Sequence, residues 1–149
     1  MPRLDHIGIA VPNLGPAITQ WQAMGFAAGE IEIVAAEQVR VAMLEGAPGT
    51  RIELLEPMSE TSSMARFLAR RGPGLHHVAF AVPHLAACIA ELRQAGLRLL
   101  PAAAAAGAGG HAYVFVHPAS AAGVLTEFIE DPAAAVADIR PVEAVMGKK

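Results

Sequence analysis

The chain contains two histidines whose surroundings are nearly the same. His6 lies in the segment LDHIGIAVPNL (Leu4–Leu14), and His77 lies in LHHVAFAVPHL (Leu75–Leu85). Apolar residues alternate in both segments with the histidine and with glycine or alanine, which is the period of two typical of a β-strand. Because the face that carries each histidine otherwise holds small residues, it leaves space for a ligand above the strand.

Two glutamates are duplicated in the same way. Glu53 in RIELLEP (Arg51–Pro57) matches Glu127 in LTEFIEDP (Leu125–Pro132). The matching glutamates are 74 residues apart and the matching histidines 71 residues apart, so the two pairs belong to one repeat. A charged carboxylate inside an apolar strand is costly unless it is paired or bound to a cation. These positions are therefore candidate metal ligands.

Two imidazoles and two carboxylates suit a divalent cation and leave positions for water or substrate. A single strand histidine is more often structural, and an isolated strand glutamate more often faces solvent. The recurrence of both residue types in both halves favours a shared site. The sequence therefore predicts a metal site made by His6, Glu53, His77 and Glu127, and it leaves two further glutamates facing solvent, Glu56 and Glu130.

The elements that must position these side chains follow from hydrophobic periodicity and from Gly and Pro breaks. We expect helices at Pro16–Met24, Thr61–Arg71 and Leu85–Ala95, each followed by glycine. We expect strands at Arg3–Val11, Ile31–Ala35, Gln38–Leu44, Arg51–Leu55, Leu75–Val82, Leu97–Leu100, Ala112–His117 and Val124–Ile129.

The order strand–helix–strand–strand–strand occurs twice, which indicates an α+β fold made of two βαβββ modules related by a pseudo-twofold axis. A repeat of about 70 residues is too short for two independent domains. We therefore expect one domain over residues 1–131, with module one at about 1–72, module two at about 73–131 and a C-terminal tail at 132–149.

Composition limits the classes of function. The chain has 149 residues, a net charge of −3 and one cysteine, Cys88. The charge excludes a basic nucleic-acid-binding surface, and a single cysteine excludes a disulfide framework. No apolar run reaches the roughly 18–20 residues of a membrane span, and the first strand begins too early for a targeting peptide. We expect a cytoplasmic protein that binds neither nucleic acid nor a membrane.

Other polar residues carry weaker signals. We expect His76 to be structural or to donate to a ligand, and His84 to be a solvated residue at a helix start. Cys88 is interpreted as a buried packing residue. The remaining candidates for ligand contact are His111, His117, the Gly107–Gly110 run and a basic patch able to bind phosphate, formed by Arg66, Arg70 and Arg71.

Several segments together resemble the methylmalonyl-CoA epimerases of the vicinal oxygen chelate superfamily: DHIGIAVP, RIELLEP, GLHHVAFAVP, GAGGHAYVFVHP and GVLTEFIE. The resemblance extends from about Leu4 to Glu130. It implies the vicinal oxygen chelate fold, in which two βαβββ modules form a metal-holding cleft. It further implies one divalent metal ion per chain, Co²⁺ in the first instance or Ni²⁺, Mn²⁺, Zn²⁺ or Fe²⁺, held by the four residues that the repeat singles out. A homodimer is also implied.

The activity implied by this resemblance is interconversion of (R)- and (S)-methylmalonyl-CoA, a small acyl-CoA substrate. Glu127 and Glu53 would exchange the α-proton on opposite faces of a metal-stabilised enolate. The chain departs from the family at two places: Ala119 stands where epimerases usually carry lysine, and the Val39–Leu44 strand lacks the additional carboxylate of some members. One methylene changes binding too little to separate methylmalonyl-CoA from ethylmalonyl-CoA.

Three other functions share parts of these features. A glyoxalase I-type lyase acting on a thiol–aldehyde adduct would use the same four ligands. A non-catalytic binding protein of the superfamily would usually lack them. An extradiol dioxygenase would use two histidines and one carboxylate, commonly in a longer chain.

Overall fold

Seven strands form one mixed sheet in the order β2-β3-β4-β1-β5-β7-β6. The computed structural model describes residues 1–101 and 107–138. The strands are β1 Arg3–Ala10, β2 Ala27–Val34, β3 Val39–Glu45, β4 Arg51–Pro57, β5 Gly74–Val82, β6 Tyr113–Val116 and β7 Thr126–Glu130. The α-helices are α1 Leu14–Ala23, α2 Ser63–Arg71 and α3 Leu85–Gln94. Short 3₁₀ helices are η1 Ala35–Glu37, η2 Ala108–Gly110, η3 Pro118–Ser120 and η4 Pro132–Asp138.

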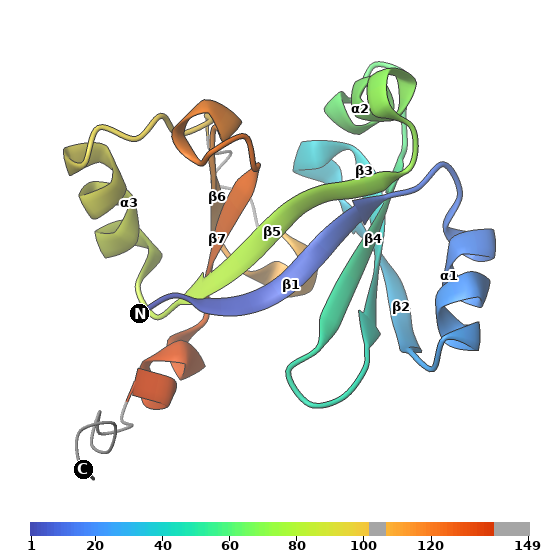
Figure 1. Cartoon of the computed structure of the whole chain (residues 1–149), viewed down its shortest axis with the longest axis horizontal. Helices are drawn as coiled ribbons and strands as arrows, with labels where there is room; N and C mark the ends of the chain where they lie inside the picture. The colour runs from blue at the N-terminus through green and yellow to red at the C-terminus, as the bar shows by residue number, and fades with distance from the viewer. Residues whose placement is uncertain (102–106, 139–149) are drawn as a thin grey trace, which may run out of the picture.

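The strand order carries the pseudo-twofold symmetry that the repeat predicts. β1 and β5 run antiparallel through the middle of the sheet, with α1 and α3 at opposite ends of the molecule (Figure 1). β4 lies parallel to β1 on one side, and β7 lies parallel to β5 on the other. β3 and β6 then add antiparallel to β4 and β7. The repeat therefore brings the histidine strands together and sets the glutamate strands outside them.

The predicted helices are confirmed, and their ends lie within two residues of the prediction. The predicted strand Leu97–Leu100 is reduced to one isolated antiparallel bridge between Leu99 and Val116, with one backbone hydrogen bond on each side of it. The pairing extends no further, and the N–H of Arg98 donates to the Ser120 hydroxyl. Pro101, which follows, has no N–H to donate. Module two therefore keeps three full strands beside its helix.

In module one, a different helix packs against each face of the sheet. α1 packs through Leu14 and Ala17 onto a cluster that includes Leu44, Ile52 and Leu54. On the opposite face, α2 packs through Met64 onto a second cluster, which includes Val39, Val41 and Leu55. Alternation along β4 therefore sends Glu53 to the face that α2 borders. Within residues 1–101 and 107–138, no helix is long and apolar enough to cross a membrane.

The expectation that Glu56 and Glu130 face solvent is wrong. Each is partly buried at the end of its strand and accepts a hydrogen bond from the first N–H of a helix. The Leu14 N–H of α1 donates to Glu56 at 2.8 Å, and the Leu85 N–H of α3 donates to Glu130 at 2.9 Å. Helix starts leave such N–H groups without partners inside the helix, and a carboxylate there also meets the positive end of the helix dipole.

Candidate metal centre and active site

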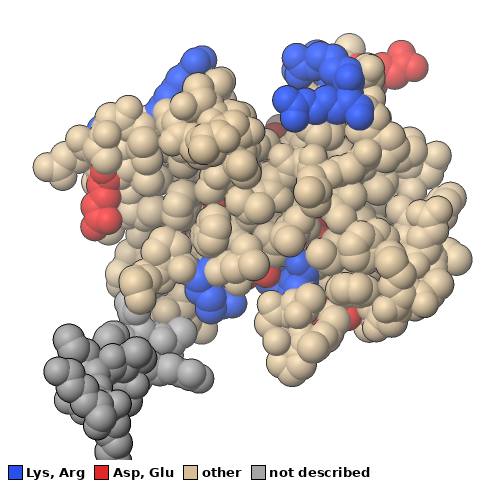
Figure 2. Space-filling view, viewed as in Figure 1, with Lys and Arg blue, Asp and Glu red and all other residues tan. Residues whose placement is uncertain are grey.

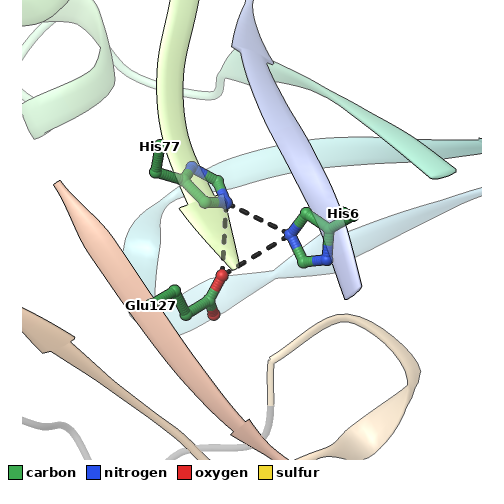
Figure 3. A group of neighbouring side chains, drawn as sticks. All are labelled: His6, His77 and Glu127. Carbon is green, nitrogen blue, oxygen red and sulfur yellow. Dashed lines mark hydrogen bonds and ion pairs between the residues drawn. The ribbon is translucent and has the colours of Figure 1, made fainter. Parts of the chain in front are cut away.

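Three buried side chains from three strands point at one another inside the cleft (Figure 3). His6 comes from β1, His77 from β5 and Glu127 from β7. The two Nε2 atoms lie 3.2 Å apart. Oε2 of Glu127 lies 3.5 Å from Nε2 of His6 and 3.2 Å from Nε2 of His77. Residues from both modules therefore converge on one point.

Glu53 completes the arrangement from the other side. Its Oε1 lies 3.7 Å from Nε2 of both histidines. Its strand, β4, and the strand of Glu127, β7, flank the β1–β5 pair on opposite sides. Glu53 and Glu127 are 5% and 8% exposed, so neither carboxylate is well solvated. All four residues that the repeat singles out thus lie together in the structure.

The donor spacing suits a divalent cation. Metal–ligand bonds of about 2.0–2.2 Å at tetrahedral or octahedral angles place neighbouring donors about 2.8–3.6 Å apart. The three separations among His6, His77 and Glu127 fall in this range, and Glu53 is slightly further away. Two imidazole nitrogens with carboxylate oxygens suit Zn²⁺, Co²⁺, Ni²⁺, Mn²⁺ or Fe²⁺. The residues present therefore fit a metal ion, whose identity they leave open.

Two irregularities in the β1–β5 pairing shape the site. The register passes from Leu4↔Phe80 to His6↔Ala79, which leaves Asp5 without an opposite residue. It then passes from Gly8↔His77 to Ile9↔Leu75, which leaves His76 as the extra residue on β5. Such bulges redirect side chains. The residue before each cleft histidine therefore turns inward beside that histidine.

Asp5 and His76 hold the histidines that follow them. Oδ2 of Asp5 accepts from Nδ1 of His6 at 2.8 Å, and Nδ1 of His76 lies 3.0 Å from Nδ1 of His77. With Nδ1 occupied in this way, Nε2 of each ring is left to face the site. When Nε2 of His77 faces a metal, its Nδ1–H donates to Nδ1 of His76, so His76 accepts this hydrogen bond and does not act as the predicted donor. The sequence did not single out Asp5. The matching pairs Asp5-His6 and His76-His77 were the available signal.

Arg51 supports Asp5 from β4. Its Nη1 donates to both carboxylate oxygens of Asp5, at 3.0 and 2.9 Å. Burial raises the pKa of Asp5, but the hydrogen bond from His6 and the charge of Arg51 together lower it by more, and the net pKa is below its ordinary value. Asp5 therefore stays ionised, which makes it a strong acceptor for the His6 ring.

Without a bound cation, the surroundings shift the pKa values of the cleft residues in different directions. Burial lowers the pKa of His6, but hydrogen bonds to Asp5 and Glu127 and the charge of Glu53 raise it to about 9. Burial raises the pKa of Glu53. Burial also raises the pKa of Glu127, yet both cleft histidines bring it down to about 2. Burial and the neighbouring His77 lower the pKa of His76 to about 4.

A cavity of about 590 Å³ opens above this cluster. His77, Glu53 and Glu127 line one part of it, and its walls include apolar side chains such as Met64, Phe67, Leu100 and Phe115. A second cavity of about 130 Å³ also reaches Glu53 and Glu127. Large cavities lined by apolar groups with a few converging polar groups are typical of small-molecule sites.

Some of the other candidate residues line the two cavities, and others do not. His117 lines the large cavity, and its Nδ1 accepts from the N–H of Ala119. His111 lines the small cavity and bonds the Glu130 carbonyl. His84 is exposed at the start of α3, as expected. Cys88 packs beside Val82, Leu85 and Val114 as predicted, although it is partly rather than fully buried. Gly107 and Ala108 line the large cavity, whereas residues 102–106 of the Ala-rich stretch lie outside the described residues.

Comparison with known proteins gives consistent matches. Residues 5–115 match the family model described as the Glyoxalase/Bleomycin resistance protein/Dioxygenase superfamily. The chain is 35% identical to the ethylmalonyl-CoA/methylmalonyl-CoA epimerase of Cereibacter sphaeroides, over 84% of this chain and 95% of the relative. The chain belongs to the methylmalonyl-CoA epimerase family. This membership also confirms the predicted vicinal oxygen chelate fold.

Solved structures of methylmalonyl-CoA epimerases superpose closely on the fold. The epimerase from Mycobacterium tuberculosis matches with a TM-score of 0.82 at 36% identity, covering 90% of this chain and 91% of that chain. A variant of the Streptomyces coelicolor epimerase, in complex with 2-nitronate-propionyl-CoA, matches with a TM-score of 0.79 at 35% identity, covering 87% of this chain and 96% of that chain.

Proposed function

We propose that the protein is a metal-dependent epimerase that interconverts (R)- and (S)-methylmalonyl-CoA. The observation that carries the proposal is the convergence of His6, His77 and Glu127 beside the large cavity, with Glu53 approaching from the opposite side of the β1–β5 pair. The relatives named above support the substrate class, since one is an ethylmalonyl-CoA/methylmalonyl-CoA epimerase and another was solved with a CoA thioester.

His6, His77, Glu127 and Glu53 would hold the metal ion, for which we propose Co²⁺. When bound, a divalent cation supplies Lewis-acid stabilisation of negative charge on the thioester and carboxylate oxygens of the substrate, worth several kcal/mol. Asp5 and His76 fix the ring orientations through Nδ1 of each histidine. The chain therefore supplies both the donor set and the partners that orient it.

Glu127 and Glu53 would move the proton. For one epimer, a carboxylate oxygen of Glu127 accepts the α-proton, and the electron pair of the C–H bond delocalises into the thioester as an enolate. The carboxylic acid of Glu53 then donates its proton to the opposite face of the α-carbon. For the other epimer the roles are exchanged. Because each turnover reverses the protonation of the two groups, both must exchange protons with solvent, and both line the small cavity.

The first test is proton NMR of methylmalonyl-CoA in D₂O with the purified protein. We expect loss of the α-proton signal, inhibition by a chelator and recovery with Co²⁺. Glu127→Gln and Glu53→Gln should each remove most of the exchange, whereas Glu91→Gln, on an exposed face of α3, should leave it intact. Full exchange by the Glu53→Gln/Glu127→Gln double variant would contradict the residue assignment.

The same samples test the other functions. No exchange by folded, metal-loaded protein would refute the epimerase, and turnover of a hemithioacetal would then identify a glyoxalase I-type lyase. Exchange that survives complete removal of metal would refute the metal requirement. Absence of both metal binding and turnover would identify a non-catalytic binding protein.

Three further properties belong to this proposal. We propose a homodimer, supported by exposed apolar side chains on the edge strand β2, including Ile31 and Ile33 at 44% and 64% exposure. Light scattering at several concentrations tests it, and a monomer at all of them would refute it.

We also propose a cytoplasmic location, to be tested by cell fractionation. We also propose that residues 1–131 form one domain without the tail. Expression of this fragment tests the proposal, since it should fold by itself.

A further inference from the structure

The helix α2 carries an excess of positive charge. It lies between β4 and β5, at the junction of the two modules, and contains Arg66, Arg70 and Arg71 within nine residues. Figure 2 shows a cluster of Lys and Arg side chains at the top of the molecule, where Figure 1 places α2. The whole chain has a net charge of −3, so this local cluster has the opposite sign to the protein.

Two of these arginines line the large cavity. Arg70 and Arg71 border the same cavity of about 590 Å³ that is lined by Glu53, His77 and Glu127. Among the described residues that line this cavity, no other Lys or Arg is present. The cavity therefore joins a carboxylate and imidazole cluster to a pair of guanidinium groups.

These guanidinium groups have no carboxylate partner within 4.0 Å in the part of the chain that the structure describes. Arg3, Arg40 and Arg51, by contrast, each pair with an aspartate or glutamate. The guanidinium carbon of Arg71 lies 5.7 Å from the centre of the Phe67 ring, over which it stacks. Both arginines are exposed and line the cavity, so their N–H donors are accessible to solvent and to a ligand.

We propose that Arg70 and Arg71 bind the phosphate groups at the nucleotide end of an acyl-CoA whose acyl end lies at Glu53, His77 and Glu127. This inference rests on the proposed function and extends it to the substrate's other end. An acyl-CoA carries its reactive thioester and its phosphates at opposite ends of one flexible chain, and the cavity has matching chemistry at both places. Guanidinium groups bind phosphate through paired, charge-assisted hydrogen bonds.

A purely structural role makes a different prediction. Cations in the last turn of a helix interact favourably with its dipole, which alone would explain arginines at the end of α2. Arg93 provides the matched control, because it also lies in the last turn of a helix, α3, is exposed and does not line the cavity. The two roles differ in their effect on substrates with and without nucleotide phosphates.

The experiment compares methylmalonyl-CoA with methylmalonyl-pantetheine, which lacks those phosphates, for wild type, Arg70→Gln/Arg71→Gln and Arg93→Gln. Loss of charge-assisted phosphate contacts should raise KM for the CoA substrate by about tenfold. It should leave kcat and the KM for the pantetheine substrate within about twofold of wild type. The wild-type KM for the CoA substrate should also rise with salt, and more steeply than that of the double variant. Arg93→Gln should behave as wild type with both thioesters.

Two results would overturn the proposal: an unchanged KM for the CoA substrate in the double variant, or an equal rise for both thioesters. Calorimetric titration with adenosine 3′,5′-bisphosphate gives a readout that needs no turnover, so it stays decisive if the epimerase proposal fails. We expect binding to wild type and to Arg93→Gln, and binding at least tenfold weaker to Arg70→Gln/Arg71→Gln. Equal binding to all three proteins, or no binding to wild type at millimolar concentration, would refute the phosphate site.

Discussion

A methyl group on Gly8 would lie 2.1 Å from Cε1 of His77, and within 2.6 Å of both ring nitrogens. Gly8 is paired with His77 across the β1–β5 ladder and with Glu53 across the β1–β4 ladder. The His77 ring therefore occupies the space that a side chain at position 8 would fill. The missing Cβ is what allows this imidazole to reach the cluster.

Gly8→Ala should displace the His77 ring and cause the loss of most metal binding. Overpacking of a buried position also costs about 1–3 kcal/mol of stability. Metal content after purification and thermal unfolding measure the two effects. Gly15→Ala is the control, since a Cβ there meets nothing within 4 Å. Full metal content in Gly8→Ala would show that the ring can be accommodated elsewhere.

Asp5→Asn should weaken metal binding by about 10–100-fold, the usual cost of removing the partner that orients a histidine ligand. The neutral amide loses the charge that holds Nδ1 of His6 and loses the paired donation from Arg51. Competition with a chromogenic chelator measures the affinity. Glu45→Gln is the control, because Glu45 is exposed at the end of β3 and lines neither cavity. An unchanged affinity in Asp5→Asn would exclude a positioning role.

Glu56→Ala and Glu130→Ala should each destabilise the fold by about 1 kcal/mol, because each leaves the first N–H of a helix without its acceptor. The two losses should add in the double variant, since the residues lie in different modules. Urea unfolding measures them. Glu91→Ala, at an exposed position, should change stability by less than about 0.5 kcal/mol. Destabilisation confined to one module would show that the two contacts are not equivalent.

Tyr113 is the chain's one tyrosine, so ultraviolet absorbance reports its ionisation directly. Burial and the hydrogen bond that its hydroxyl donates to Glu37 at 2.8 Å raise the pKa of Tyr113 above its ordinary value of 10.0. The native protein should titrate later than the unfolded chain. Above pH 10 the unfolded state releases this proton first, so stability should fall as pH rises.

The control for this titration separates the two causes. Glu37→Gln removes the acceptor charge and should bring the tyrosine midpoint down toward 10, whereas the exposed Glu45→Gln should leave it unchanged. A native wild-type midpoint at the ordinary value would mean that the contact between Tyr113 and Glu37 does not persist in solution.

Local pattern was sufficient for the three helices, for most of the strands and for the four cleft residues. The period of two around His6 and His77, the glycines after each helix and the duplication of Glu53 and Glu127 are all visible in the chain. Hydrophobic alternation decides which face a strand residue takes, and repetition decides which positions are equivalent. The full strand predicted at Leu97–Leu100 does not form, because the length of its pairing depends on a partner strand far along the chain, which local pattern does not reveal.

The sequence by itself determined the duplicated fold and the chemistry of the donor set. Tertiary structure decided how the donors are oriented and what surrounds them. The bulges that turn Asp5 and His76 inward are properties of the pairing between two strands; the sequence shows a polar residue before each cleft histidine but not the direction in which it points. Glu56 meets a helix start 42 residues away, and Arg70 meets a cavity whose walls come from both modules. Such contacts depend on strand order and register, because these alone bring distant segments within hydrogen-bond reach.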